Sequence, residues 1–269
     1  MTIYYKPNFP QSPPFPAMLA VGDSWFWYPK VSNLLAEISA IVRPDYSNIM
    51  AYGYIGARLE EYVQGRYAAD FYYEMKPQNA QYYSAVLISG GGNDVVDWNL
   101  CLKADCSQQT SPKDCIDSAQ TAANMDSLAG WLFTMISTIH SAYDRNGLRR
   151  PAVIAHCYDY PLPDGRPFVD PVFHTRIVGP WLKPAMDARG VPADLDFRTK
   201  LMHALLDSMA EALSELHSPA DNVWVVQSLG TLDVDEADWD NELHPTGRGF
   251  RKLVHGPWRA LLEQAGLAA

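Results

Sequence analysis

The chain alternates short apolar runs with segments of helical spacing. Five apolar runs are only a few residues long and end in turn-forming residues, which is typical of buried strands. They are AMLAVGD (17–23), SNIMAY (47–52), YSAVLISGGG (83–92), RRPAVIAHCYDY (149–160) and DNVWVVQS (221–228). Strands that alternate with helices favour an α/β fold with a mostly parallel sheet. The pattern therefore predicts a five-stranded sheet of this kind.

Five segments between and after these runs have apolar residues at helical spacing. They cover residues 32–42, 56–75, 117–147, 196–217 and 246–266. No internal repeat or convincing linker divides the chain, so we expect a single domain over 1–269. A proline-rich leader (7–16) precedes the first strand. Two irregular insertions are expected, at about 97–116 and 159–195, and long loops of this kind are usually functional.

Charge and composition exclude several classes of partner. The formal net charge is −10 and lysines and arginines form no run, which argues against nucleic acid or an anionic membrane as the partner. No apolar stretch approaches the roughly 20 residues of a transmembrane helix. The first residues lack the pattern of a signal peptide, which predicts a cytoplasmic protein for the chain as written.

Three of the four cysteines, Cys101, Cys106 and Cys115, cluster in the first insertion. A metal site is not expected, because the segment has no CxxC pair and no nearby histidine. Free thiols and a local Cys106–Cys115 disulfide both remain open. A disulfide would favour a secreted or periplasmic protein.

Four polar clusters follow predicted strands. They are GDS (22–24), AYGYIG (51–56), GGGND (90–94) and NELHP (241–245). In open parallel sheets the site forms beyond the carboxyl ends of the strands, so we expect all four clusters at one edge.

These clusters contain the parts of an acyl-transfer site. Ser24 needs a base to take its proton, and His244 is the histidine that follows a strand within a polar cluster. Asn93 could donate to a developing oxyanion together with the Ser24 N–H and a glycine of the second cluster. Taken singly, Ser24 is more typical of a helix N-cap, and Asn93 is at least as typical of a turn.

Taken together and in order, the four clusters resemble those of the SGNH hydrolases, the GDSL-type esterase and lipase family. The resemblance implies a flavodoxin-like three-layer α/β/α sandwich with no metal or organic cofactor. By position, Ser24 would be the nucleophile, His244 the general base, and Ser24, Gly56 and Asn93 the oxyanion donors, with Gly53 a weaker candidate than Gly56.

The resemblance also implies an ester hydrolase that acts through an acyl-enzyme on a small-molecule or glycan ester. Two alternatives remain open. One is a carbohydrate O-acetylesterase or acyltransferase with the same machinery, and the other is a non-catalytic binding protein with a degenerate triad.

The sequence departs from the family at two positions. Trp25 follows the GDS motif where the family has leucine or isoleucine, and we expect it to pack in the core or to line a substrate pocket. Asn241 stands where the family has an acid. The group that orients His244 is therefore Asn241, Asp240 or a backbone carbonyl. Glu242 is the weakest candidate because it lies so close to His244 in sequence.

Overall fold

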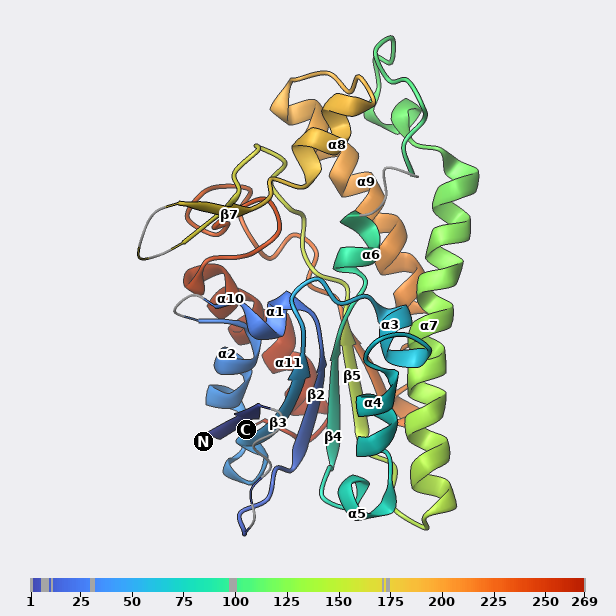
Figure 1. Cartoon of the computed structure of the whole chain (residues 1–269), viewed down its shortest axis with the longest axis vertical. Helices are drawn as coiled ribbons and strands as arrows, with labels where there is room; N and C mark the ends of the chain where they lie inside the picture. Colours follow the sequence, from blue (N-terminus) through green and yellow to red (C-terminus); the bar gives the residue numbers. More distant parts are fainter. Residues whose placement is uncertain are drawn as a thin grey trace.

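The computed structural model describes residues 2–5, 10, 12–29, 32–96, 101–170, 172 and 175–268. Its centre is a parallel sheet of six strands in the order β1-β3-β2-β4-β5-β8 (Figure 1). The strands are β1 (Thr2–Tyr5), β2 (Met18–Gly22), β3 (Asn48–Gly53), β4 (Ala85–Ser89), β5 (Ala152–His156) and β8 (Val223–Val226). Every residue of β2, β4, β5 and β8 is buried, which explains their unbroken apolar runs.

Helices cover both faces of this sheet (Figure 1). One group packs together from α1 (Ser24–Trp27), α2 (Leu34–Ile41), α10 (Gly247–Leu253), the π-helical turn η5 (Val254–Trp258) and α11 (Arg259–Gln264). The other contains α3 (Leu59–Val63), α4 (Ala68–Glu74), α5 (Pro77–Ala80), α7 (Ser118–Arg145) and α9 (Leu195–Ser214). The remaining short elements are η1 (Pro44–Tyr46), α6 (Gly92–Val96), η3 (Pro112–Cys115), β6 (Phe168–Val169), β7 (Arg176–Val178), α8 (Leu182–Ala188) and η4 (Pro219–Asp221).

The predicted α/β class with a parallel sheet is confirmed. Without the edge strand β1, the order of the strands is 2-1-3-4-5, the flavodoxin-like arrangement, whose ligand crevice opens beside the first strand. Here that strand is β2. Its last residue, Gly22, lies between Gly53 of β3 and Ser89 of β4. A Cβ on Gly22 would lie 2.4 Å from the Ser89 carbonyl oxygen, so only glycine allows the strands to end this close together.

The predicted count of five strands is wrong, because β1 adds a sixth at the edge. Its four residues pair with β3 in parallel register, from Thr2 beside Asn48 to Tyr5 beside Ala51. They lie upstream of the proline-rich leader and are only partly buried. A short edge strand of this kind has no long apolar run from which it could be predicted.

Two predicted helices are interrupted. Residues 56–75 form α3 and α4, and the break includes Gly65, where a Cβ would lie 2.6 Å from the Cα of Glu61. Residues 246–266 form α10, η5 and α11, because Gly256 has non-helical dihedral angles and Pro257 lacks an N–H.

The second expected insertion, 159–195, is more regular than predicted. It contains the antiparallel pair β6–β7 and helix α8. The described part of the first insertion, from residue 101 onward, is joined at its ends by a bridge between Leu102 and Ile116. Residues 97–100 lie outside the described part.

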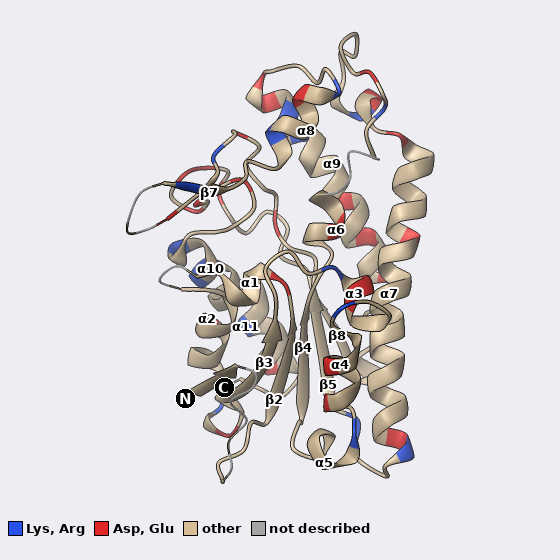
Figure 2. Cartoon of the chain, in the orientation of Figure 1, with Lys and Arg blue, Asp and Glu red and all other residues tan. Residues whose placement is uncertain are grey.

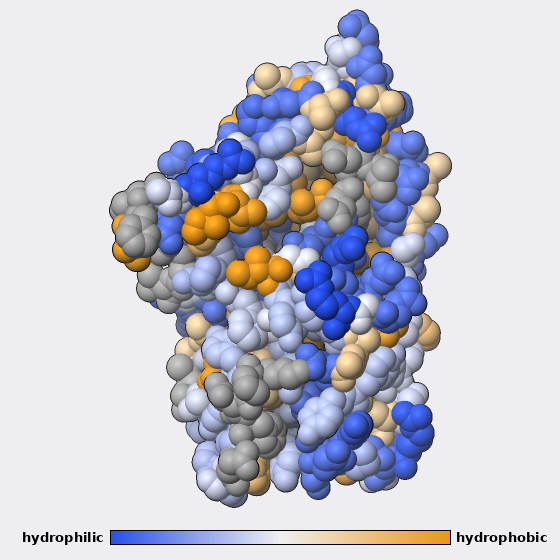
Figure 3. All heavy atoms as spheres, viewed as in Figure 1, coloured by the Kyte–Doolittle hydropathy of each residue, from blue (hydrophilic) through white to orange (hydrophobic). Residues whose placement is uncertain are grey.

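Charged residues are distributed along the helices and loops (Figure 2). No described helix is long and apolar enough to cross a membrane. Exposed hydrophobic side chains include Ile55, Ile177 and Val178, and Figure 3 shows apolar surface around β7. All four cysteines are buried free thiols. The Cys106–Cys115 disulfide is therefore not formed in this structure.

Candidate active site

Ser24 is the first residue of α1 and directly follows the turn at the end of β2. The preceding Asp23 is the helix N-cap, and its Oδ1 accepts the N–H of Trp25 at 3.1 Å. Asp23 also accepts hydrogen bonds from the hydroxyls of Ser89, at 2.8 Å, and Tyr158. Burial raises the pKa of the Asp23 carboxyl above its ordinary value. The buried hydrogen bonds of Asp23 thus hold the turn that carries Ser24 in place.

His244 faces this serine from the loop between β8 and α10. Its Nε2 lies 2.7 Å from Ser24 Oγ, although the two residues are 220 positions apart. Both side chains are almost completely buried, with 6% of each residue exposed. The distance is that of a nucleophile hydrogen-bonded to its base.

Asn241 lies on the other side of the imidazole. Its Oδ1 is 3.0 Å from His244 Nδ1, and it also accepts the backbone N–H groups of Leu243 at 3.0 Å and His244 at 3.1 Å. Two N–H donors can face only the oxygen of the amide, so they fix which way the amide points. Nδ1 must then carry the hydrogen, which leaves Nε2 free to accept the proton of Ser24.

Asp240 lies one step further from the imidazole. Its Oδ2 accepts a hydrogen bond from the hydroxyl of Tyr28, and the amide nitrogen of Asn241 lies 3.4 Å away. The same amide nitrogen donates to the Tyr28 hydroxyl at 3.0 Å. The structure therefore places both of the side chains weighed from the sequence near His244, with Asn241 in direct contact and Asp240 behind it.

Two aromatic rings enclose the imidazole. Tyr28 stacks on it with ring centroids 4.5 Å apart and an interplanar angle of 13°. Trp181, just before α8, approaches edge-on at 5.9 Å and 66°. These contacts keep the ring of His244 in one plane and shield it from water.

The three expected oxyanion donors are not equally placed. Asn93, on α6, lines the same cavity as Ser24, and its Nδ2 donates to the Ala57 carbonyl at 2.9 Å. Gly56 lies in the exposed turn after β3, with φ of +81°, and is not among the described residues that line the cavity. Gly53 ends β3 against Trp27, where a Cβ would overlap the indole at 1.1 Å.

The cavity beside Ser24 is narrow. Its volume is about 50 Å³, which is room for a few non-hydrogen atoms. Its described walls are mostly apolar and include Trp25, Val95, Val96, Leu182, Met202, Leu206, Trp239 and Leu243. Trp25 is 4% exposed and donates from its indole to the Leu243 carbonyl at 3.0 Å. Trp25 is therefore both a buried core residue and part of the cavity wall.

Glu242 has a structural role that the sequence did not reveal. Its carboxylate is fully buried and accepts four backbone N–H groups, from Gly165 at 3.0 Å, Trp181 at 2.5 Å, Leu182 at 2.7 Å and Lys183 at 2.9 Å. Three of these lie at the start of α8, at its N-cap Trp181 and its first two residues. Because its partners are backbone groups, no side-chain pattern could have indicated them. Glu242 thus anchors the second insertion to the loop that carries His244.

A buried histidine supports the floor of the site. His156, at the end of β5, accepts the N–H of Tyr158 at Nδ1, so its Nε2 carries the hydrogen and donates to Ser89 Oγ at 2.9 Å. Ser89 in turn donates to Asp23. Burial lowers the pKa of His156 to about 3, which keeps the ring neutral.

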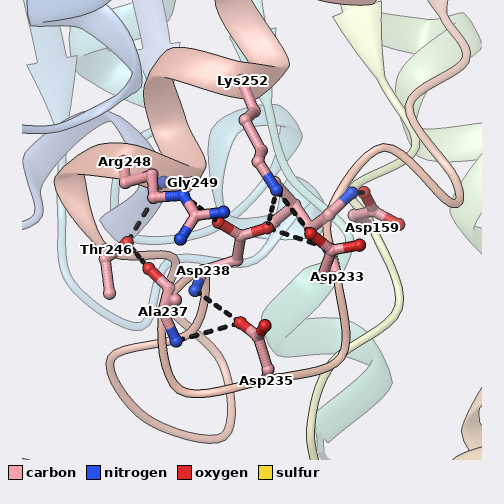
Figure 4. A network of polar contacts seen from close by, with 10 residues as sticks. Asp159, Asp233, Asp235, Ala237, Asp238, Thr246, Arg248, Gly249 and Lys252 are labelled. Carbon is pink, nitrogen blue, oxygen red and sulfur yellow. Dashed lines mark hydrogen bonds and ion pairs between the residues drawn. The ribbon is translucent and has the colours of Figure 1, made fainter.

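The loop before His244 is held to α10 by a cluster of charges (Figure 4). Asp238 is fully buried, and it pairs with Lys252 at 2.5 Å and with Arg248 at 3.3 Å. Its backbone carbonyl accepts the N–H of Thr246, the N-cap of α10, at 2.8 Å.

Among the described residues, no group of three His, Cys, Asp or Glu side chains is placed to hold a metal ion.

Comparison with known proteins gives similarity in structure but not in sequence. No family model and no curated protein matches the chain. Among solved structures, a lipase named Lip_vut3 from a goat-rumen metagenome superposes with a TM-score of 0.54 at 11% identity, over 93% of this chain and 97% of that one. A carbohydrate acetylesterase from Sinorhizobium meliloti superposes with a TM-score of 0.45 at 13% identity, over 93% and 98% of the two chains. A putative SGNH hydrolase from Slackia heliotrinireducens gives 0.42 at 14%, over 93% and 97%. The chain therefore has the fold of the rumen lipase.

Proposed function

We propose that this chain is a single-domain ester hydrolase of the SGNH type, with Ser24 as nucleophile and His244 as general base. The observation that carries the proposal is the hydrogen-bonded series Ser24 Oγ, His244 and Asn241, in which the backbone fixes the tautomer of the imidazole. In a Ser–His–Asp protease, asparagine in place of the aspartate lowers kcat about 10⁴-fold because the wrong tautomer is favoured. Here the carbonyl of Asn241, not its amino group, faces Nδ1, so this problem does not arise.

In the proposed reaction, Ser24 Oγ attacks the ester carbonyl carbon as its proton passes to His244 Nε2. The tetrahedral intermediate expels the alcohol, which takes that proton from His244 and leaves an acyl-Ser24 ester. Water then attacks the acyl group by the same route and releases the acid and free Ser24.

The backbone N–H of Ser24 and the side-chain amide of Asn93 are the proposed oxyanion donors. The amide nitrogen of Asn93 has two hydrogens, and the bond to the Ala57 carbonyl occupies one of them and fixes the plane of the amide. The second hydrogen is left for the substrate oxygen. Gly56, in the turn after β3, is the proposed third donor.

The proposed substrate is an ester with a short acyl group. The small apolar cavity beside Ser24 supports this assignment, because an acetyl group fits within it. The cavity does not distinguish a glycan acetate from a simpler acetate, so the O-acetylesterase remains the second candidate.

The test is hydrolysis of p-nitrophenyl esters of increasing chain length, together with labelling by a fluorophosphonate. The wild-type protein should hydrolyse the acetate best and become labelled, and Ser24→Ala should do neither while keeping the wild-type circular dichroism spectrum. Release of acetate from acetylated xylan would then favour the glycan substrate. A wild-type protein that hydrolyses no ester and takes up no label would refute the proposal and favour a non-catalytic binding protein.

A further inference from the structure

The acidic side chain of Asp240 lies behind Asn241, the residue that contacts His244 Nδ1, and further hydrogen bonds connect the two. We propose that Asn241, Tyr28 and Asp240 form a hydrogen-bonded relay through which the negative charge of Asp240 stabilises the protonated imidazole of His244. This inference rests on the proposed function, since it concerns how the base of that reaction is supported.

The hydrogen bonds of the relay all run in one direction. His244 donates from Nδ1 to Asn241 Oδ1, Asn241 donates from Nδ2 to the Tyr28 hydroxyl, and Tyr28 donates to Asp240 Oδ2. Each bond therefore polarises the next, with the positive end at the imidazole and the carboxylate at the other end. A hydrogen bond that ran in the opposite direction would oppose this polarisation.

The interior of the relay is shielded from water. Tyr28 is 3% exposed and Asn241 is fully buried, so the interaction between Asp240 and the imidazole is screened less than it would be in solvent. Burial, followed by the hydrogen bond to Asp240 and its charge, raises the pKa of Tyr28 well above its ordinary value. The phenol therefore keeps its proton and donates it in a hydrogen bond to Asp240 Oδ2.

The other acids around the site are engaged elsewhere. Glu242 faces the first turn of α8 and accepts four N–H groups. Asp159, at the cavity wall, accepts the N–H groups of Tyr160, Gly230 and Leu232 at 2.6 to 2.8 Å. Asp23 faces Ser89 and Tyr158 beneath Ser24. The two rings against the imidazole, Tyr28 and Trp181, are uncharged.

The experiment compares wild type, Tyr28→Phe, Asp240→Asn and the double variant in two assays. The first is an NMR titration of the His244 ring, which does not depend on turnover. Loss of a nearby negative charge disfavours the protonated ring, so Asp240→Asn should move the titration midpoint to lower pH by about half a unit to one unit. The second is kcat for p-nitrophenyl acetate, which should fall about 10- to 100-fold at unchanged KM, less than the ~10⁴-fold loss when a triad aspartate is replaced directly.

The double variant tests whether Tyr28 and Asp240 act as one unit. Its titration midpoint and kcat should match those of Asp240→Asn, because both paths from Asn241, through the Tyr28 hydroxyl and directly from Nδ2 at 3.4 Å, end at the Asp240 carboxylate. The chain offers a matched control in Tyr160, which stacks on His203 with centroids 3.8 Å apart and donates to Asp207 at 2.5 Å. Tyr160→Phe and Asp207→Asn should leave the His244 titration and kcat unchanged.

An unchanged His244 midpoint in Asp240→Asn would overturn the relay, and so would additive effects in the double variant. Either result can be obtained while wild type hydrolyses esters and Ser24→Ala does not, so the relay can fail while the proposed function stands. If wild type is inactive, the proposed function fails, and the NMR titration still decides whether the charge of Asp240 reaches the imidazole.

Discussion

Replacing Glu242 with glutamine should detach helix α8 from the loop that carries His244. The carboxylate accepts four backbone N–H groups, two at each oxygen. Glutamine can accept only at its remaining oxygen, so two N–H groups would face an amide donor. Hydrogen bonds to a charged group contribute about 1.5–3 kcal/mol each.

The two lost bonds thus amount to about 3–6 kcal/mol, partly offset because a neutral amide is easier to bury than a carboxylate. A net loss of about 3 kcal/mol is the expected result. In a protein of this size it lowers Tm by about 6–12 °C.

Thermal unfolding followed by circular dichroism measures this loss, and hydrogen exchange at residues 181–183 shows whether α8 opens before the rest. Glu236→Gln is the matched control, because Glu236 is exposed in the same loop between β8 and α10. Glu242→Gln should also raise KM for p-nitrophenyl acetate, since Trp181 would no longer be held against His244. A Tm within about 1 °C of the control, with unchanged exchange at α8, would show that the four contacts do not hold the helix.

Three further predictions address other parts of the site. Asn93→Ala should lower kcat about 10²- to 10³-fold with little change in KM, as removal of an oxyanion donor does; an equal rate would remove Asn93 from the proposed site. The pKa of His156 is lower in the folded protein than in the unfolded chain, so protons bind preferentially to the unfolded chain below about pH 6.5. The contribution of His156 to the free energy of unfolding is therefore complete above about pH 6.5 and falls as the pH drops towards 3. Urea unfolding should therefore give about 3 kcal/mol less stability from this group at pH 4.5 than at pH 7.5, and His156→Gln should show a correspondingly smaller acid loss. Titration with a thiol reagent should find no reactive cysteine in the native protein and four after unfolding; only two after unfolding would mean that a disulfide exists.

The sequence predicted the sheet well because a strand buried on both faces is a continuous apolar run. It missed β1, whose four residues lie at the edge and are only partly buried. It also predicted one helix where α3 and α4 lie and one where α10 and α11 lie. The helical spacing of apolar residues continues across the glycine and proline at which the backbone leaves the helical conformation.

Of the site residues predicted from the sequence, Ser24, Asn93 and His244 line one cavity, and Gly56 is not among the described residues that line it. The sequence could not predict the partner of Asp240, because Tyr28 lies 212 residues away and belongs to an aromatic run that packing alone explains. Glu242 was undervalued for a related reason. It was considered only as a neighbour of His244, whereas its partners are backbone N–H groups of a distant insertion.

The position of Glu242 between Asn241 and His244 has a consequence for turnover. One short loop holds both the orienting partner of the base and the anchor of the helix that brings Trp181 over it. A displacement of Trp181 or of the start of α8 would therefore reach the same loop that aligns the imidazole. The orientation of the His244 ring is thus expected to depend on whether α8 is held in place by Glu242.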